Sequence, residues 1–96
     1  MTRTSHWVAE CFWPGASDEE LGDLDRRLVD AASEPARTGG PASYLGCLRI
    51  PDDDVVLFLF EGSIGSVRQV AESTGIRAER ILHCIPRLRP LTRSHS

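Results

Sequence analysis

Short apolar stretches rich in β-favouring residues alternate along the chain with two segments in which apolar residues recur at helical spacing. Residues 6–13 form the first stretch, which is rich in aromatic side chains and ends at a Pro-Gly pair, so they predict a strand. Ser17 and Glu20 then have the spacing of a capping box, in which each side chain bonds the backbone N–H of the other residue. Leucine and alanine continue at helical spacing, so we expect an amphipathic helix over residues 18–32.

The middle of the chain predicts a β-hairpin. Residues 43–50 and 55–61 have strand composition, and the Pro-Asp-Asp-Asp segment between them is typical of a turn. The second of these strands is apolar on both sides, which favours a central position in a sheet. Residues 33–42 contain two prolines and two glycines, so we expect a long mobile loop before the hairpin.

The last third of the chain predicts a second helix and a fourth strand. Ser63 can cap the helix, and Gly75 can end it in the left-handed conformation. Residues 80–88 have strand composition, and a proline within them places this strand at a sheet edge. We expect a single domain over residues 1–88 and a flexible polar tail over residues 89–96.

The resulting order β-α-β-β-α-β predicts an α+β fold of the ferredoxin-like type. It has a four-stranded antiparallel sheet with two helices on one face, and the strands lie in the order 4-1-3-2. The other face of the sheet is apolar, and so short a chain has nothing left to cover it. We therefore expect a second copy to cover that face, which makes the protein a homodimer.

Because successive strand residues point to opposite sides, the strands can be divided into two faces. The face beneath the helices is expected to hold the three cysteines with Trp7, Leu45, Phe58 and Leu82. The opposite face is expected to hold Glu10, Tyr44, Glu61 and His83 among aliphatic residues. This second face is where the sequence predicts a ligand or a partner.

Composition excludes several classes of protein. A formal net charge of -3 argues against a nucleic-acid-binding surface. The longest apolar run, residues 55–60, is too short to span a bilayer, and the N-terminus does not have the pattern of a signal peptide. Three cysteines without CxxC spacing favour buried free thiols over a disulfide framework, and a soft-metal site is the alternative. We expect a cytoplasmic protein without nucleic-acid or membrane partners.

Two carboxylates are the first candidates for chemistry. Glu10 lies in the middle of an apolar strand, where a carboxylate is costly to bury unless it is paired. It can be a general base or a metal ligand, or it can form a salt bridge to an arginine such as Arg49. Glu61 can stabilise the N-terminus of the second helix through its negative charge, or it can form a carboxylate pair with Glu10.

An imidazole and a phenol complete the candidate set. His83 lies between two isoleucines on a strand, where it is either a packed histidine or a proton shuttle or metal ligand. Tyr44 is the only tyrosine, and its hydroxyl can orient a ligand or simply accompany a packed ring. The candidate catalytic residues are therefore Glu10, His83 and Tyr44, and the candidate metal ligands are Glu10, Glu61 and His83.

Four segments carry a resemblance to a known family: VAECFWPG at residues 8–15, YLGCL at 44–48, VVLFLFEG at 55–62, and residues 75–81. Together they resemble a family of small actinobacterial-type proteins whose best-known relatives are nickel-responsive and nickel-binding. The resemblance implies a ferredoxin-like dimer of the dimeric α+β barrel superfamily, with nickel as the metal. Metal-binding relatives carry a histidine near the start of the second strand, whereas residues 42–46 here have none.

These observations leave three functional hypotheses. The first is a small dimeric binding protein that holds a divalent metal, nickel by resemblance, or a small apolar ligand on the sheet face. The second is a cavity enzyme of the dimeric α+β barrel type, a cyclase, isomerase or cofactor-free oxygenase with Glu10 as general base, and it rests on analogy of fold. The third is a structural dimer without a ligand. The sequence does not decide whether the protein is an enzyme.

Overall fold

The computed structural model describes residues 5–34, 41–87 and 89. Its elements follow in the order β1 (His6–Phe12), α1 (Asp18–Ala32), β2 (Ala42–Ile50), β3 (Val55–Gly62), α2 (Ile64–Thr74) and β4 (Arg80–Cys84). One turn of 3-10 helix at Pro51–Asp53 joins β2 to β3. No helix in this part of the chain is long and apolar enough to cross a membrane.

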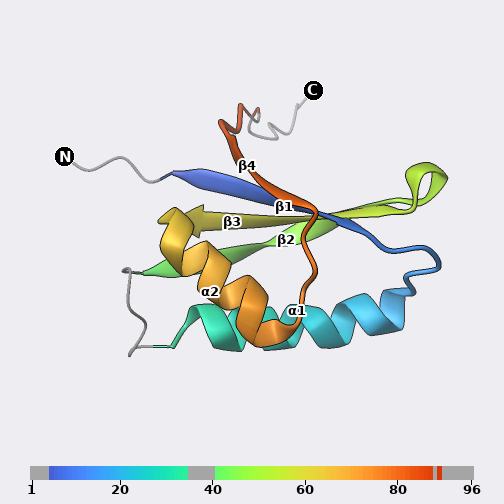
Figure 1. The fold of residues 1–96 in the computed structure, drawn as a ribbon, viewed down its shortest axis with the longest axis horizontal. Coiled ribbons are helices and arrows are strands. Elements are labelled where there is room, and N and C mark those ends of the chain that lie inside the picture. Colours follow the sequence, from blue (N-terminus) through green and yellow to red (C-terminus); the bar gives the residue numbers. More distant parts are fainter. Residues whose placement is uncertain (1–4, 35–40, 88, 90–96) are drawn as a thin grey trace, which may run out of the picture.

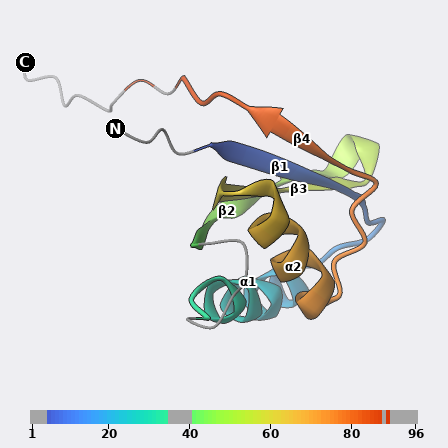
Figure 2. The same cartoon turned by 60° about the vertical axis from the view of Figure 1, so that its left-hand side comes forward.

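The strands form one antiparallel sheet in the order β2-β3-β1-β4. Both helices lie on the same side of this sheet, as the two views in Figure 1 and Figure 2 show. The element order, the strand order and the placement of the helices confirm the predicted ferredoxin-like α+β fold. The predicted bounds of α1 are also confirmed, whereas β4 ends at Cys84, before the proline.

The capping box at the start of α1 is present. The Ser17 hydroxyl accepts from the Glu20 N–H at 3.1 Å, and the Glu20 carboxylate accepts from the Ser17 N–H at 3.1 Å. Three acidic residues in the first turn add favourable charge near the helix N-terminus. With its start fixed, α1 turns Leu21, Leu24 and Leu28 toward the sheet, where they are buried.

The ends of α2 also follow the sequence. Ser63 caps the helix, and its hydroxyl accepts from the Ser66 N–H at 3.2 Å. Gly75 ends the helix with a φ of 83°, and the Ile76 N–H donates to the Ala71 carbonyl at 3.0 Å. This left-handed ending turns the chain back toward the sheet and leads it into β4.

The core lies between the sheet and the helices. Alternate residues of β3, Val56, Phe58 and Phe60, are fully buried there. Ala9 of β1 is also fully buried and leaves room for the aromatic rings beside it. The central strands therefore supply the fully buried part of the sheet's core.

The predicted side of Tyr44 is wrong, because β2 contains a register irregularity between Tyr44 and Gly46. Tyr44 pairs with Phe60 and Cys47 pairs with Phe58, so both residues face the helices. Leu45, expected in the core, is half exposed. An extra residue in one strand inverts the alternation on one side of it, which the sequence pattern alone did not show.

The predicted sides of the β4 residues are also wrong. Ile81 pairs with Ala9 and His83 pairs with Trp7, so these two residues share the face that bears the helices. Leu82 and Cys84 lie on the opposite face. The alternation within β4 was correct, but the pairing with β1 differs by one residue from the one assumed.

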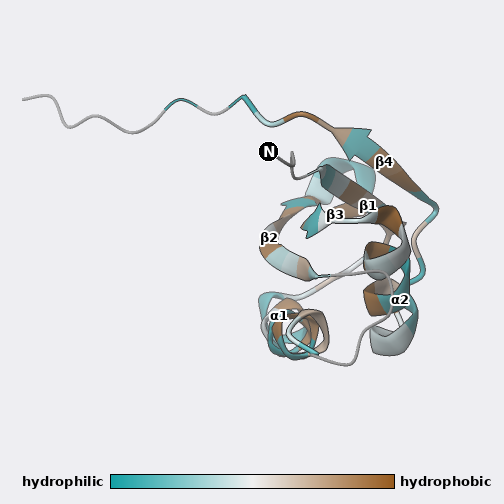
Figure 3. Cartoon of the chain, turned by 90° about the vertical axis from the view of Figure 1, so that its left-hand side faces the viewer, coloured by the Kyte–Doolittle hydropathy of each residue, from teal (hydrophilic) through white to brown (hydrophobic). Residues whose placement is uncertain are grey.

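The face of the sheet away from the helices is uncovered in the described part of the chain. Phe12 is 60% exposed, Leu48 is 58% exposed and Leu82 is 41% exposed. Figure 3 shows the sheet nearly edge-on, with α1 and α2 both on one side of it. We call this surface the open face, defined by the outward side chains of β1 to β4: His6, Val8, Glu10, Phe12, Leu48, Ile50, Val55, Leu57, Leu59, Glu61, Arg80, Leu82 and Cys84.

One glycine permits a close approach at the end of β3. Gly62 has a φ of 135°, and a Cβ atom there would lie 2.5 Å from the Pro41 carbonyl oxygen. Its N–H donates to the Ser5 carbonyl at 2.9 Å, and its own carbonyl accepts from the Trp7 indole at 2.9 Å. This residue therefore ties the start of β1 and the start of β2 to β3.

Two predictions lie largely outside the described residues. The expected mobile loop at residues 33–42 includes 35–40, and the expected polar tail includes 90–96. Both stay predictions.

Replacing Ser17 with alanine should lower the free energy of unfolding by about 1 kcal/mol, because an N-terminal N–H of α1 loses its acceptor. Urea denaturation followed by circular dichroism measures this change. Ser33→Ala, which removes an exposed hydroxyl from the other end of the helix, is the matched control and should change the value by less than about 0.5 kcal/mol. Equal effects of the two substitutions would contradict the role of the capping box.

Candidate functional site

An imidazole and a carboxylate meet at one end of the open face. His6 Nε2 lies 3.2 Å from Glu61 Oε2, and both side chains are partly exposed. The contact follows from the register, since His6 of β1 is the direct neighbour of Glu61 of β3. Glu61 therefore pairs with His6, while Ser63 caps α2 in its place.

A thiol and a hydroxyl extend this pair into a row across the sheet. Cys84 of β4 is the direct neighbour of His6 on the other side, and Ser43 of β2 is the direct neighbour of Glu61. The row Ser43–Glu61–His6–Cys84 thus crosses all four strands at one level. Even so, within residues 5–34, 41–87 and 89 no three His, Cys, Asp or Glu side chains lie close enough together to hold a metal ion.

Glu10 lies on the open face as predicted, but it is neutralised by Arg80. The Glu10 carboxylate accepts from Arg80 Nε at 2.5 Å, across the β1–β4 pair. Arg49, the partner considered from the sequence, instead donates to the Ala16 carbonyl at 2.7 Å. Glu10 is also four residues from His6 along β1, or roughly 13 Å at the rise of a strand, so Glu10 and Glu61 do not form a carboxylate pair.

His83 and Tyr44 lie on the other face of the sheet from Glu10. The exposed His83 ring lies against Trp7, with the ring centroids 5.0 Å apart. Tyr44 is in the opposite edge strand, separated from β4 by β3 and β1. The structure therefore does not bring Glu10, His83 and Tyr44 together, nor Glu10, Glu61 and His83.

Tyr44 bonds to an aspartate that the sequence analysis did not single out. Its hydroxyl donates to Asp25 Oδ1 of α1 at 2.5 Å, and the Cys47 sulfur lies 3.9 Å from the same oxygen. Burial and the Asp25 carboxylate raise the pKa of Tyr44. The helical pattern of α1 alone does not reveal this contact, because the bulge in β2 is what turns Tyr44 toward Asp25.

The three cysteines are separate free thiols, as predicted, but only Cys11 is buried, and Cys47 and Cys84 are partly exposed. Cys11 is in the core, Cys47 lies beside Asp25, and Cys84 is on the open face. Burial, with the nearby carboxylates of Glu79 and Glu10, raises the pKa of the Cys11 thiol to about 11. Cys11 is therefore protonated at neutral pH and is a poor nucleophile.

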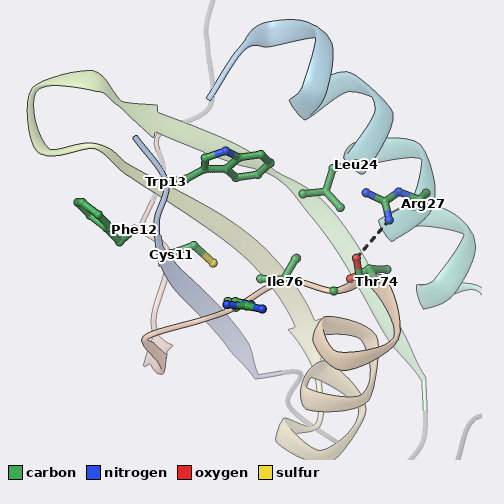
Figure 4. A pocket seen from close by; sticks show the side chains of 9 residues that line it. Cys11, Phe12, Trp13, Leu24, Arg27, Thr74 and Ile76 are labelled. Atoms are coloured by element: carbon green, nitrogen blue, oxygen red, sulfur yellow. Dashed lines mark hydrogen bonds between the residues drawn. The ribbon is translucent and has the colours of Figure 1, made fainter. Parts of the chain in front are cut away.

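A cavity of about 240 Å³ lies between the end of β1, the middle of α1 and the C-terminal end of α2. Figure 4 shows Cys11 and Trp13 on one side of it, with Leu24 and Arg27 of α1 opposite. Its lining is completed by Phe12, Thr74, Gly75, Ile76 and Arg77. This cavity lies on the helix side of the sheet, and Phe12, at the end of β1, is its one lining residue that also belongs to the open face.

Comparison with known proteins supports the fold. No family model matches the chain, and no curated protein matches it significantly. Among solved structures, the protein SCO4226 from Streptomyces coelicolor A3(2) matches with a TM-score of 0.72 and 16% sequence identity, over 86% of this chain and 99% of the other. This likeness shows a fold shared with a small actinobacterial protein.

The only tyrosine should resist ionisation while the protein is folded. Because the pKa is raised in the folded state, Tyr44 contributes stability that is fully present below pH 10 and is lost as the pH rises through the folded-state pKa. Absorbance at 295 nm should stay flat through pH 10 and rise only with alkaline unfolding. In urea the same titration should centre near pH 10. Ionisation near pH 10 in the folded protein would contradict the Tyr44–Asp25 bond.

Proposed function

We propose that this protein is a binding module that pairs with a second copy through the open face and holds a divalent cation there. The observation that carries the proposal is the His6–Glu61 pair at the end of an uncovered apolar sheet face. The resemblance of the sequence to nickel-binding proteins makes nickel the first metal to test.

The arrangement of the open face favours a protein partner. Its middle is apolar, with Val8, Leu57 and Leu59 side by side on the central strands. Polar groups lie at one end of the face, in the His6–Glu61 pair, and along its β4 edge, where the Glu10–Arg80 pair is level with Leu57. An apolar centre with a polar rim is the usual anatomy of a protein interface.

The occupant is a second copy of this chain, because a two-fold axis through the apolar centre of the face would match like with like. Each copy would then present an apolar centre to the other's, and the polar groups would come together at the rim. Such an interface is self-complementary and closes as a dimer.

The chemistry of the His6–Glu61 pair suits a borderline divalent ion. Imidazole nitrogen and carboxylate oxygen are ligands that nickel and zinc accept in proteins. One protomer supplies two such donors, which is fewer than a stable site needs, and a second protomer would supply two more. The metal would therefore be held by His6 and Glu61 of both copies, with Cys84 beside them.

The missing histidine in residues 42–46 is compatible with a metal site at the His6–Glu61 pair. The stretch where metal-binding relatives carry a histidine includes Ser43, which is the direct neighbour of Glu61 in the sheet. In this chain the imidazole of that row comes from β1, at His6. A site at this level of the sheet can therefore keep its imidazole although residues 42–46 have no histidine.

Binding is preferred here over general-base catalysis. The Glu10 carboxylate is occupied by an ion pair with Arg80. Its expected partners His83 and Tyr44 are on the far side of the sheet. The cavity-enzyme hypothesis required Glu10, His83 and Tyr44 on one face, and they are not on one face.

Substituting Leu48 with glutamate should convert the dimer into a monomer, because it places a charge beside Leu57 within the proposed apolar interface. Sedimentation velocity at micromolar concentration measures the change. Val29→Glu is the matched control, since Val29 is 50% exposed on α1, away from the open face, and this variant should remain dimeric. A wild-type protein that sediments as a monomer would overturn the self-association.

Nickel titration by calorimetry should give saturable heat with one ion per dimer. His6→Ala and Glu61→Gln should each weaken binding by at least the roughly 10-fold to 100-fold that follows loss of an outer-shell partner. His83→Ala, which removes an imidazole from the other face, should bind as the wild type does. Absence of heat with an intact dimer would remove the metal and leave the ligand-free dimer.

A further inference from the structure

We propose that the cavity between β1, α1 and α2 binds a small organic anion, a carboxylate carried on one aromatic ring or a branched aliphatic group. This site lies on the helix side of the sheet and does not depend on the dimer or on a metal. The proposal rests on the shape of the cavity, its apolar walls and the two guanidinium groups that line it.

The size of the cavity limits the ligand. Its volume is about 240 Å³, below the roughly 300–1,000 Å³ of sites that hold drug-sized molecules. Trp13, Leu24 and Ile76 supply indole and aliphatic surface, and the protonated Cys11 thiol adds a weakly polar wall. A single ring or a short branched chain fits such walls and such a volume.

Two arginines supply the positive charge. Arg27 of α1 is held in place at the cavity, because its Nη1 donates to the Thr74 carbonyl at 3.3 Å (Figure 4). A guanidinium has five N–H donors, so this single bond leaves donors for a carboxylate. Arg77, in the connection from α2 to β4, also lines the cavity and forms no ion pair within the part of the chain that the structure describes.

The carboxylates near the cavity leave a positive balance. Glu79 and Glu10 are close enough to Cys11 to raise the pKa of its thiol. Of these two carboxylates, Glu10 is paired with Arg80 on the open face, whereas Glu79 forms no ion pair within the described part of the chain. The residues that line the cavity include two arginines and no aspartate or glutamate, which favours an anion over a cation or a neutral molecule.

A purely structural role explains only part of this arrangement. The Arg27–Thr74 bond satisfies a carbonyl at the C-terminus of α2 and joins the two helices, as a helix end requires. It does not account for a second arginine at the same cavity, or for the open volume between an indole and two aliphatic side chains. A small anion would fill that volume and neutralise both cations.

The test is an NMR titration of the full chain with phenylacetate, in metal-free buffer. The two indole N–H signals report on opposite ends of β1, because Trp13 lines the cavity and the Trp7 indole donates to the Gly62 carbonyl. The Trp13 signal should shift and saturate, while the Trp7 signal stays in place. Phenylacetamide, which has the same shape without the charge, should bind roughly tenfold more weakly.

Three variants locate the charge requirement. Arg77→Gln should weaken phenylacetate binding roughly tenfold, and Glu79→Gln should strengthen it. Arg68→Gln is the matched control, because Arg68 is an exposed arginine of α2 that does not line the cavity. This variant should leave binding unchanged. An unchanged Trp7 signal in each variant shows that the sheet is intact.

The proposal is overturned if the Trp13 signal does not saturate, if phenylacetamide binds as well as phenylacetate, or if Arg68→Gln weakens binding as much as Arg77→Gln. None of these results bears on nickel, because no metal is present in the titration. Loss of nickel binding in His6→Ala, in turn, leaves this cavity unaffected.

Discussion

The structure depends on one imbalance: two helices cover one side of a sheet whose central strands are apolar on both sides. Residues Val56, Phe58 and Phe60 bury one side of β3 beneath α1 and α2. The other side of the same strand presents leucines to the open face. The hydrophobic effect favours burial of apolar side chains on both sides of the sheet, but the helices bury only one side. Every proposal about association starts from that difference.

The chemistry on the two faces differs accordingly. On the helix side, polar groups join neighbouring elements: Tyr44 bonds the sheet to α1 through Asp25, and Arg27 joins α1 to α2 through the Thr74 carbonyl. On the open face, the polar groups meet only one another, at the His6–Glu61 and Glu10–Arg80 pairs. Groups of the first kind stabilise the monomer, whereas groups of the second kind remain accessible to a partner or an ion.

Local signals in the sequence predicted the fold well, because they act over a few residues. The Ser17–Glu20 capping box set the start of α1, and the left-handed Gly75 set the end of α2. The candidate site was harder to predict, because it depends on how strands align over long separations. A bulge after Tyr44 and a shift of one residue in the pairing of β4 were enough to move Tyr44 and His83 to the other face. Neither feature can be recognised from the alternation of apolar and polar residues in the sequence.

The glycine at the end of β3 has a consequence for how the open face can change. Because a methyl group at Gly62 would collide with the Pro41 carbonyl, β2 and β3 can keep this spacing only while position 62 lacks a side chain. The adjoining residue, Glu61, owes its alignment with His6 and Ser43 to that spacing. A substitution at Gly62 would therefore disorganise the polar end of the sheet while leaving each of its donor groups in the chain.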